Sequence, residues 1–247
     1  LLEGISMIRG RYTPWDESAL KLRTFEILEI DTKNIESTRI ELNDNSFCNA
    51  DLIYGRFPAN NFVVKELLFK SGYIACETSF RIALGKLHEY TLPPLYSRRM
   101  LPVNKAKKSE FKDIADIARD MFKFSRFHED PFIQKHLSDI RMYQWVNDLA
   151  NQDVACLVNK SNLGDIISFM IYKVNDRKQV DLILGGSKKG FEMHSPFFWG
   201  SVISYFKSEG VSKVFTTISA ANNGVLTLYQ NLGFKIIETN IDYHKHV

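Results

Sequence analysis

One stretch decides how this chain folds: residues 217–234, which read TISAANNGVLTLYQNLGF. A run of β-branched and aromatic side chains, residues 214–218, leads into it and is typical of a strand. After two asparagines, apolar side chains recur at helical spacing as far as Tyr229. Gly233 then ends the helix, and Phe234 opens another strand. The pattern predicts a strand–helix–strand unit in which an asparagine follows the first strand.

The asparagines and the tyrosine of this unit carry a chemical prediction. The side-chain amide of Asn222 or Asn223 can pair with another amide, and pantetheine is a chain of amides. Tyr229 lies one to two turns inside the helix, so its hydroxyl can point back toward the strand end. A phenol beside a sulfur atom can protonate a departing thiolate. The simpler alternative is that Tyr229 is a core aromatic residue.

The residues before this unit predict further elements of an α/β fold. The expected elements are, in order, a strand at 99–103, helices at 110–124 and 132–150, strands at 154–158, 165–172 and 179–184, and a helix at 195–209. Short turns join the three successive strands, so we expect an antiparallel meander. Ser195 is the expected N-cap of the last helix, and Pro196 its first residue.

The first hundred residues repeat the deciding stretch in weaker form. Residues 59–64 read ANNFVV and residues 221–226 read ANNGVL, and each run sits between a strand-like segment and a turn glycine followed by an aromatic residue. We therefore expect a duplicated strand–helix–strand unit, with residues 1–98 as a degenerate half-domain and residues 99–247 as the full domain. The alternative is that shared packing rules make two unrelated units look alike.

A loop rich in glycine and lysine precedes the helix at 195–209. A glycine-rich turn before a helix N-terminus exposes backbone N–H groups at the positive end of the helix dipole, which favours phosphate. The two lysines add positive charge for a pyrophosphate or a 3′-phosphate. The residues expected to bind cofactor here are Leu184, Gly185, Gly186, Lys188, Lys189, Gly190 and Ser195.

The order asparagine, Leu-Tyr and Gly-Phe in residues 222–234 resembles the last motif of the Gcn5-related N-acetyltransferase superfamily. The resemblance implies an acyl-CoA co-substrate, pantetheine contacts at Asn222 or Asn223, and Tyr229 as general acid. It also implies a mixed, mostly antiparallel sheet whose central strands splay apart around Leu184 and Val214, where backbone donors polarise the thioester carbonyl. The loop after Leu184 departs from the superfamily pattern, because it is longer and lacks a Gly-x-Gly at the helix start.

Residues 124–131, which read FSRFHEDP, resemble a narrower branch, the WecD-type N-acyltransferases that modify dTDP-linked amino-deoxy sugars. The resemblance implies transfer of an acetyl or hydroxybutanoyl group to a sugar amine, in the biosynthesis of surface polysaccharides such as O-antigen and lipopolysaccharide. Arg126 suits the nucleotide pyrophosphate, and Phe127 or Tyr143 suits the base or sugar. His128 and Asp130 are candidates to accept the amine proton, with Glu192 or a water molecule as alternatives to His128 as the catalytic base.

Two other functions are kept open by the sequence. One is an acyltransferase with another acceptor, such as a peptide, a polyamine or an antibiotic. The other is a binding module that retained the fold without catalysis, which the irregular phosphate loop permits.

Composition narrows the classes of partner and cofactor. The net charge of +3 is spread along 247 residues, so neither nucleic acid nor a membrane is an expected partner. The resemblance to a superfamily whose members often dimerise implies that a homodimer is possible. The three cysteines are far apart, which indicates reduced thiols in the cytoplasm. No metal is expected, because the spacing of the His, Glu and Asp residues in 128–136 matches no ligand pattern and the reaction needs none. His244 and His246 are expected at the surface.

Overall fold

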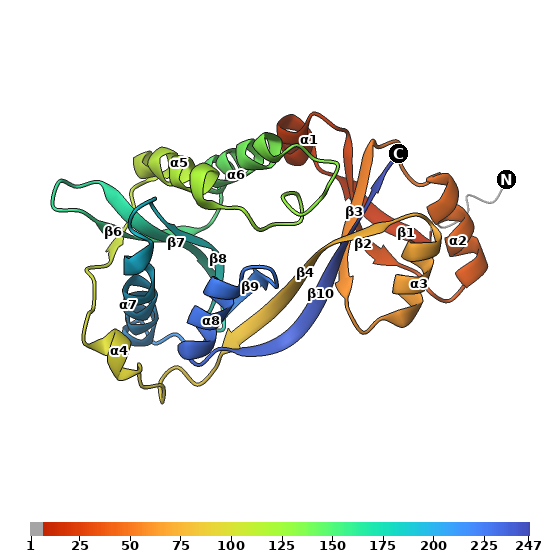
Figure 1. Cartoon of the computed structure of the whole chain (residues 1–247). Helices are drawn as coiled ribbons and strands as arrows, with labels where there is room; N and C mark the ends of the chain where they lie inside the picture. Colours follow the sequence, from red (N-terminus) through yellow and green to blue (C-terminus); the bar gives the residue numbers. More distant parts are fainter. Residues whose placement is uncertain (1–6) are drawn as a thin grey trace. The chain divides into compact units, whose positions relative to one another are not determined.

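The computed structural model describes residues 7–247, which form two compact units (Figure 1). Unit 1 comprises the described residues up to Ser79, with Phe124–Ser138 and Glu238–Val247; unit 2 comprises Phe80–Lys123 and Asp139–Ile237. The predicted division into residues 1–98 and 99–247 concerns repeated sequence rather than packing, and it stays a prediction. No helix within residues 7–247 is long and apolar enough to cross a bilayer.

Unit 1 is built on a mixed sheet. Its elements are β1 (Ile8–Tyr12), α1 (Pro14–Leu20), β2 (Thr24–Ile30), α2 (Ile35–Asp44), β3 (Leu52–Pro58), α3 (Phe62–Lys70), the first part of β4 (Ile74–Leu84) and most of β10 (Lys235–His246). The strand order is β1-β2-β3-β10, with β2 and β3 parallel and the other two pairs antiparallel.

Unit 2 contains the predicted meander. Its elements are α4 (Pro94–Ser97), β5 (Asn104–Lys105), α5 (Phe111–Met121), most of α6 (Lys135–Leu149), β6 (Ala155–Lys160), β7 (Ile166–Val174), β8 (Gln179–Ser187), α7 (Ser195–Ser208), β9 (Lys213–Ser219) and α8 (Asn223–Asn231). β5 to β8 pair antiparallel in chain order, and β8 then pairs parallel with β9. The last residues of β4 lie on the far side of β9.

Helices cover both faces of the unit 2 sheet. Met170 and Tyr172 of β7 belong to the apolar cluster that α7 and α8 complete, whereas Phe169 and Ile171 belong to the cluster formed with α5 and α6. Because successive side chains of a strand point to opposite faces, the two pairs of helices lie on opposite sides of the sheet, as Figure 1 also shows for α5 and α7.

The expected duplicated unit is present as two matching sets of elements, β3–α3–β4 and β9–α8–β10. The side-chain oxygens of Asn61 and Asn222 both accept a hydrogen bond from the backbone N–H three residues later, at 3.2 and 3.3 Å, and so cap α3 and α8. Gly72 and Gly233 follow these helices with φ of 80° and 84°, a left-handed conformation that favours glycine.

The final strand of each repeat is divided between the two units. β4, from the first repeat, belongs to unit 1 up to Ser79 and to unit 2 from Phe80, where its end lies beside β9. β10, from the second repeat, belongs to unit 2 up to Ile237 and to unit 1 from Glu238, and it pairs antiparallel with β3 from Asn240 to His246. Each unit therefore contains part of a strand that follows the helix of the other repeat.

The strand predicted at 99–103 and the surface position predicted for His244 are wrong. Residues 99–103 form no strand: they follow the short helix α4 without regular structure, and pairing starts only at Asn104. His244 is fully buried rather than exposed, because Phe127 packs beside its ring and its Nδ1 lies 2.7 Å from Asp130 Oδ2.

Candidate functional site

The parallel pair β8–β9 is interrupted halfway along. Pairing runs from Gln179 with Lys213 to Leu182 with Thr216 and stops there. β8 continues to Ser187 with β7 as its partner, and β9 continues to Ser219, but these two ends do not pair with each other. The predicted splay of the central strands is therefore confirmed. Backbone groups along two facing strand edges are left for another partner.

A β-bulge marks the point where the strands separate. Tyr172 of β7 pairs with Leu182 and Ile171 pairs with Leu184, so Ile183 is an extra residue in β8. A bulge bends its strand and leaves the extra residue outside the regular ladder. The backbone of β8 at this position can therefore face the separated edges, where it could donate to a thioester carbonyl.

Gly185 and Gly186 lie in β8 and not in the loop that their sequence predicted. They pair with Met170 and Phe169 of β7. A Cβ atom on Gly185 would lie 2.5 Å from Met170 Cε and 3.0 Å from Trp199 Cζ2, so a close approach of side chains requires glycine there. The prediction of a turn was wrong because glycine signals both turns and close packing.

The loop between β8 and α7 is shorter than predicted and holds the lysines. Lys188, Lys189 and Gly190 are exposed, and Gly190 has φ of 87°. A 3₁₀ turn, Glu192–His194, leads into α7. Ser195 is the first helical residue rather than the N-cap, and its Oγ lies 2.7 Å from Ser187 Oγ. No side chain caps α7, but the Ser195 N–H donates to the Glu192 carbonyl and Pro196 has no N–H, so this end of the helix offers an anion mainly the positive end of its dipole.

The asparagines after β9 have different roles. Asn222 is half-buried and uses its side-chain oxygen to cap α8, so its amide nitrogen is the group left for a ligand. Asn223 is the exposed first residue of that helix. Both lie where β9 has separated from β8, as the sequence predicted from their place after the strand.

Tyr229 points into unit 2 from α8. Its side chain is 3% exposed and its ring packs edge-on against Phe234, with the centroids 4.8 Å apart. Burial raises the pKa of Tyr229, and the nearby Trp199 and Thr216 side chains oppose that rise. Thr216 Oγ1 in turn donates to the Leu182 carbonyl at 3.1 Å, in the last paired rung of β8 and β9. The structure thus places a protonated phenol next to the point where the strands part.

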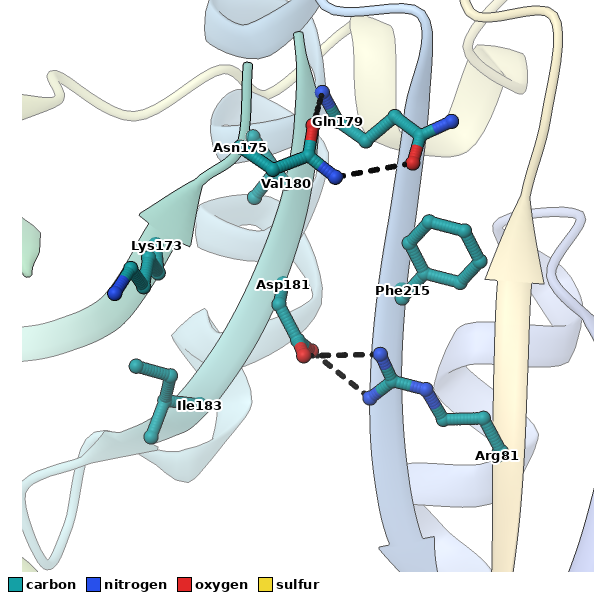
Figure 2. Close-up of a pocket in the computed structure, with 8 residues that line it drawn as sticks. All are labelled: Arg81, Lys173, Asn175, Gln179, Val180, Asp181, Ile183 and Phe215. Carbon is teal, nitrogen blue, oxygen red and sulfur yellow. Dashed lines mark hydrogen bonds and ion pairs between the residues drawn. The ribbon is translucent and has the colours of Figure 1, made fainter. Parts of the chain in front are cut away.

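A hollow of about 320 Å³ lies beside the same strands, over β8 and β9 (Figure 2). It is lined by Arg81, Lys173, Asn175, Gln179, Val180, Asp181, Ile183 and Phe215. Asp181 alternates along β8 with Val180 and Leu182, which pack against α7, so its carboxylate is on the opposite face. The hollow reaches the bulge residue Ile183 and therefore adjoins the separated edges.

An ion pair spans this hollow. Figure 2 shows Arg81 reaching from β4 across β9 to Asp181, and both guanidinium nitrogens donate to the carboxylate at 2.9 Å. Arg81 also donates to Thr217 Oγ1 at 3.2 Å and lies over the Phe215 ring. Sequence reasoning missed this pair because its members are a hundred residues apart; the one local signal was an aspartate inside the apolar run at 179–184.

Four of the five predicted substrate residues lie in unit 1. Phe127 is buried, and the Arg126 guanidinium lies between two carboxylates, 3.3 Å from Asp242 and 3.6 Å from Glu26. These carboxylates compete with a phosphate for Arg126. Ser125 Oγ lies 2.7 Å from Nδ1 of the half-buried His128.

Asp130 and Tyr143 complete the predicted set. Asp130 is buried, and its carboxylate is already bonded to His244, to His246 and to the backbone N–H of Phe132. Tyr143 lies in unit 2, half-buried on α6, with the Arg119 guanidinium over its ring. The roles predicted for these residues in substrate binding and catalysis stay predictions.

Comparisons with known proteins agree with this geometry at the level of the fold. No protein-family model matches the chain. The structure is similar to a GCN5-related N-acetyltransferase from Sphaerobacter thermophilus, with a TM-score of 0.63 and 10% identity over 98% of this chain and 78% of that one. It is also similar to a tandem GNAT protein from the clavulanic acid biosynthesis pathway, with a TM-score of 0.58 and 8% identity over 90% and 74% of the two chains.

One known protein is similar in sequence to this chain over part of its own length. The spore coat polysaccharide biosynthesis protein SpsD of Bacillus subtilis is 21% identical over an alignment of 203 residues, which covers 78% of this chain and 66% of that protein. About a third of SpsD therefore has no counterpart in the match. Taken with the structural similarities, the chain has the mixed α/β fold of the GCN5-related N-acetyltransferases.

Proposed function

We propose that this chain is an acyl-CoA-dependent N-acyltransferase. The interruption of the β8–β9 pair carries the proposal, because two unpaired strand edges can hold the amides of a pantetheine arm. The uncapped N-terminus of α7, with Lys188 and Lys189 before it, suits the CoA phosphates. Asn222 or Asn223 supplies a side-chain amide to the same arm.

The reaction is direct attack of a neutral amine on the thioester. A C–N bond forms, the C–S bond breaks, and the oxygen charge that develops is stabilised by backbone donors at the bulge from Ile183 to Gly186. Tyr229 protonates the departing thiolate, a role that its raised pKa supports by keeping the phenol protonated near neutral pH. The amine proton passes to a water molecule or to Glu192, and the role of His128 as the base stays a prediction.

The acceptor is an amino-deoxy sugar linked to dTDP, and the hollow beside β8 and β9 supports a sugar-sized acceptor. Phe215, Ile183 and Val180 offer apolar contacts there, and the other five lining side chains are polar or charged, a combination that suits a ring bearing hydroxyl and amino groups. The Asp181 carboxylate, held by Arg81, can accept hydrogen bonds from the amine or a neighbouring hydroxyl. The acyl group is acetyl or hydroxybutanoyl, and the place of action is cytoplasmic surface-polysaccharide biosynthesis, a theme shared with SpsD.

Binding and turnover test the proposal in two stages. Calorimetry with acetyl-CoA should detect one site on the full chain, and the absence of heat and of a thermal shift would favour a binding module without CoA. Release of free CoA thiol is then measured with a panel of dTDP-amino sugars, polyamines and peptides. Turnover confined to amines other than sugars would contradict the sugar acceptor while leaving acyl transfer intact.

Asp181→Asn tests whether the hollow binds the acceptor independently of the cofactor site. We expect the KM for the sugar to rise about tenfold or more, because one charge-assisted contact is worth about 1.5–3 kcal/mol. The affinity for acetyl-CoA should stay unchanged. As the matched control, Asp176→Asn alters an exposed carboxylate in the turn before β8 and should leave both constants unchanged. An unchanged KM for the sugar in Asp181→Asn would remove Asp181 from the acceptor site.

A further inference from the structure

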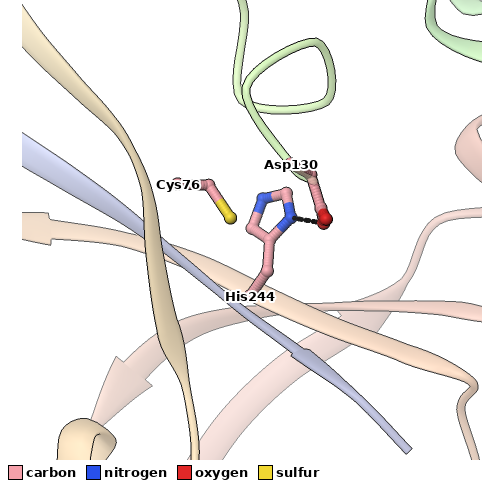
Figure 3. A group of neighbouring side chains, drawn as sticks. All are labelled: Cys76, Asp130 and His244. Atoms are coloured by element: carbon pink, nitrogen blue, oxygen red, sulfur yellow. Dashed lines mark hydrogen bonds and ion pairs between the residues drawn. The ribbon is translucent and has the colours of Figure 1, made fainter. Parts of the chain in front are cut away.

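Three potential metal ligands from distant parts of the sequence meet in unit 1 (Figure 3). They are Cys76 on β4, Asp130 in the segment before α6, and His244 on β10. One ligand atom from each lies within 4.8 Å of the other two. No sequence spacing reveals this group, since its members are separated by more than fifty residues, and the acyl transfer proposed above uses neither Cys76 nor His244.

His244 supplies the observation that calls for a ligand. Its Nδ1 lies 2.7 Å from Asp130 Oδ2, and because a carboxylate accepts, Nδ1 carries the hydrogen. With the hydrogen on Nδ1, the neutral imidazole carries its lone pair on Nε2. Nε2 is buried without a hydrogen-bond partner among the described residues. Such an atom costs about 1–3 kcal/mol if nothing binds to it.

The free nitrogen of His244 faces a thiol. Figure 3 shows one ring nitrogen bonded to Asp130 and the other on the side of the ring where the Cys76 sulfur lies. The space between a neutral imidazole nitrogen and a sulfur is where a soft divalent cation binds. An Nδ1–H that donates to a carboxylate is also the usual support of a metal-binding histidine, because it fixes the ring and its tautomer.

The charges around Cys76 favour a cation over an activated thiolate. Cys76 is half-buried, and the carboxylates of Asp130, Asp242 and Glu129 surround it. A nucleophilic cysteine requires the opposite, an electropositive setting that lowers its pKa. Asp242 pairs with Arg56 and Arg126. Asp130 instead bonds to His244, so it is the carboxylate that can orient a metal-binding histidine.

We propose that Cys76 Sγ and His244 Nε2 bind a divalent transition metal of the zinc type, with Asp130 orienting His244. His246 Nε2 also lies 2.8 Å from Asp130 Oδ2 and holds that carboxylate in place. Binding would displace the proton of the Cys76 thiol, as metal–thiolate bonds require. Two protein ligands leave coordination positions for water, so the site belongs to the open rather than the closed structural type.

Cobalt(II) is the probe, because a cobalt–thiolate bond absorbs in the near ultraviolet and tetrahedral cobalt absorbs in the visible. The full chain, freed of metal by chelation, is titrated with Co²⁺ and then with Zn²⁺ as competitor. We expect one Co²⁺ per chain, a thiolate band, and displacement by Zn²⁺. Cys76→Ser should lose the thiolate band, and His244→Gln should bind at least about tenfold more weakly.

Cys48→Ser is the matched control, since Cys48 is another half-buried thiol of unit 1 and should not affect the spectrum. Circular dichroism establishes that each variant is folded, and Asp130→Asn is the second variant if His244→Gln does not fold. A thiolate band that survives in Cys76→Ser, or no Co²⁺ binding by the folded wild type, would overturn the site. Rapid alkylation of Cys76 at pH 7 that depends on His244 would also overturn it, in favour of a nucleophilic cysteine.

Discussion

Replacing Tyr229 by phenylalanine removes one oxygen atom from the interior of unit 2 and tests the proposed general acid. The ring, its edge-on contact with Phe234 and its burial are kept. The substitution removes one buried hydroxyl near Thr216 and Trp199, which should lower the free energy of unfolding by about 1 kcal/mol and the Tm by roughly 2–4 °C for a chain of this size. Loss of a general acid lowers kcat by about 10²–10⁴-fold, equivalent to about 2.7–5.4 kcal/mol.

Tyr172→Phe is the matched control for this substitution. Tyr172 lies in the same apolar cluster, is 4% exposed, and packs edge-on against Phe206 at the same 4.8 Å between centroids. Burial also raises its pKa. We expect both variants to lose similar stability, because each gives up one buried phenolic hydroxyl. Only Tyr229→Phe should lose turnover, because the Tyr229 side chain interacts with Thr216 of β9, whereas Tyr172 lies on β7, one strand away from β9.

The assay follows thiol release from acetyl-CoA with a saturating acceptor, and calorimetry gives the affinity for acetyl-CoA in parallel. A fall in kcat with unchanged affinity for acetyl-CoA assigns the hydroxyl to the transition state. Equal kcat values for wild type and Tyr229→Phe would refute the proton donor. A fall in kcat that Tyr172→Phe shares would show that packing, not proton transfer, explains the effect.

Two further predictions concern stability. Burial, and then Asp242, raise the pKa of Glu77 from 4.5 to about 7, above its value in the unfolded chain, so its stabilising contribution is present at low pH and lost as pH rises through 7. Between pH 5 and pH 8 the wild type should lose about 2–3 kcal/mol of stability relative to Glu77→Gln in urea unfolding, and a constant difference would contradict this. Gly233→Ala should destabilise the protein by about 1–2 kcal/mol, because Gly233 has φ of 84°. Gly224→Ala should stabilise it by about 0.5–1 kcal/mol, because Gly224 lies in α8 with open space around a new Cβ. A lower Tm for Gly224→Ala than for Gly233→Ala would contradict this argument.

Local patterns explain what the sequence could predict. β7, β8, α7 and α8 fall within a few residues of their expected ranges, because side-chain period and end signals are properties of neighbouring residues. The separation of β8 and β9 could be predicted only from the resemblance to the superfamily, because no local sequence pattern shows where two strands stop pairing.

The rest depended on partners that no short window contains. The bulge at Ile183 is defined by its register against β7, and Gly185 by the side chains of Met170 and Trp199. Arg81 with Asp181, and His244 with Asp130, join residues at least a hundred positions apart. The wrong surface assignment of His244 has the same cause, because the segment that covers it lies far away in the chain.

The passage of β10 from unit 2 into unit 1 also sets the order in which the two units can be completed during synthesis. Unit 1 needs residues 238–247 to cover the edge of β3, and Asp242 in that segment pairs with Arg56 across 186 positions of sequence. A nascent chain that has left the ribosome only as far as α7 therefore exposes β3 as an open edge, which invites pairing with other chains. Completion of unit 1 therefore waits for the translation of β10, although most of the unit emerges first.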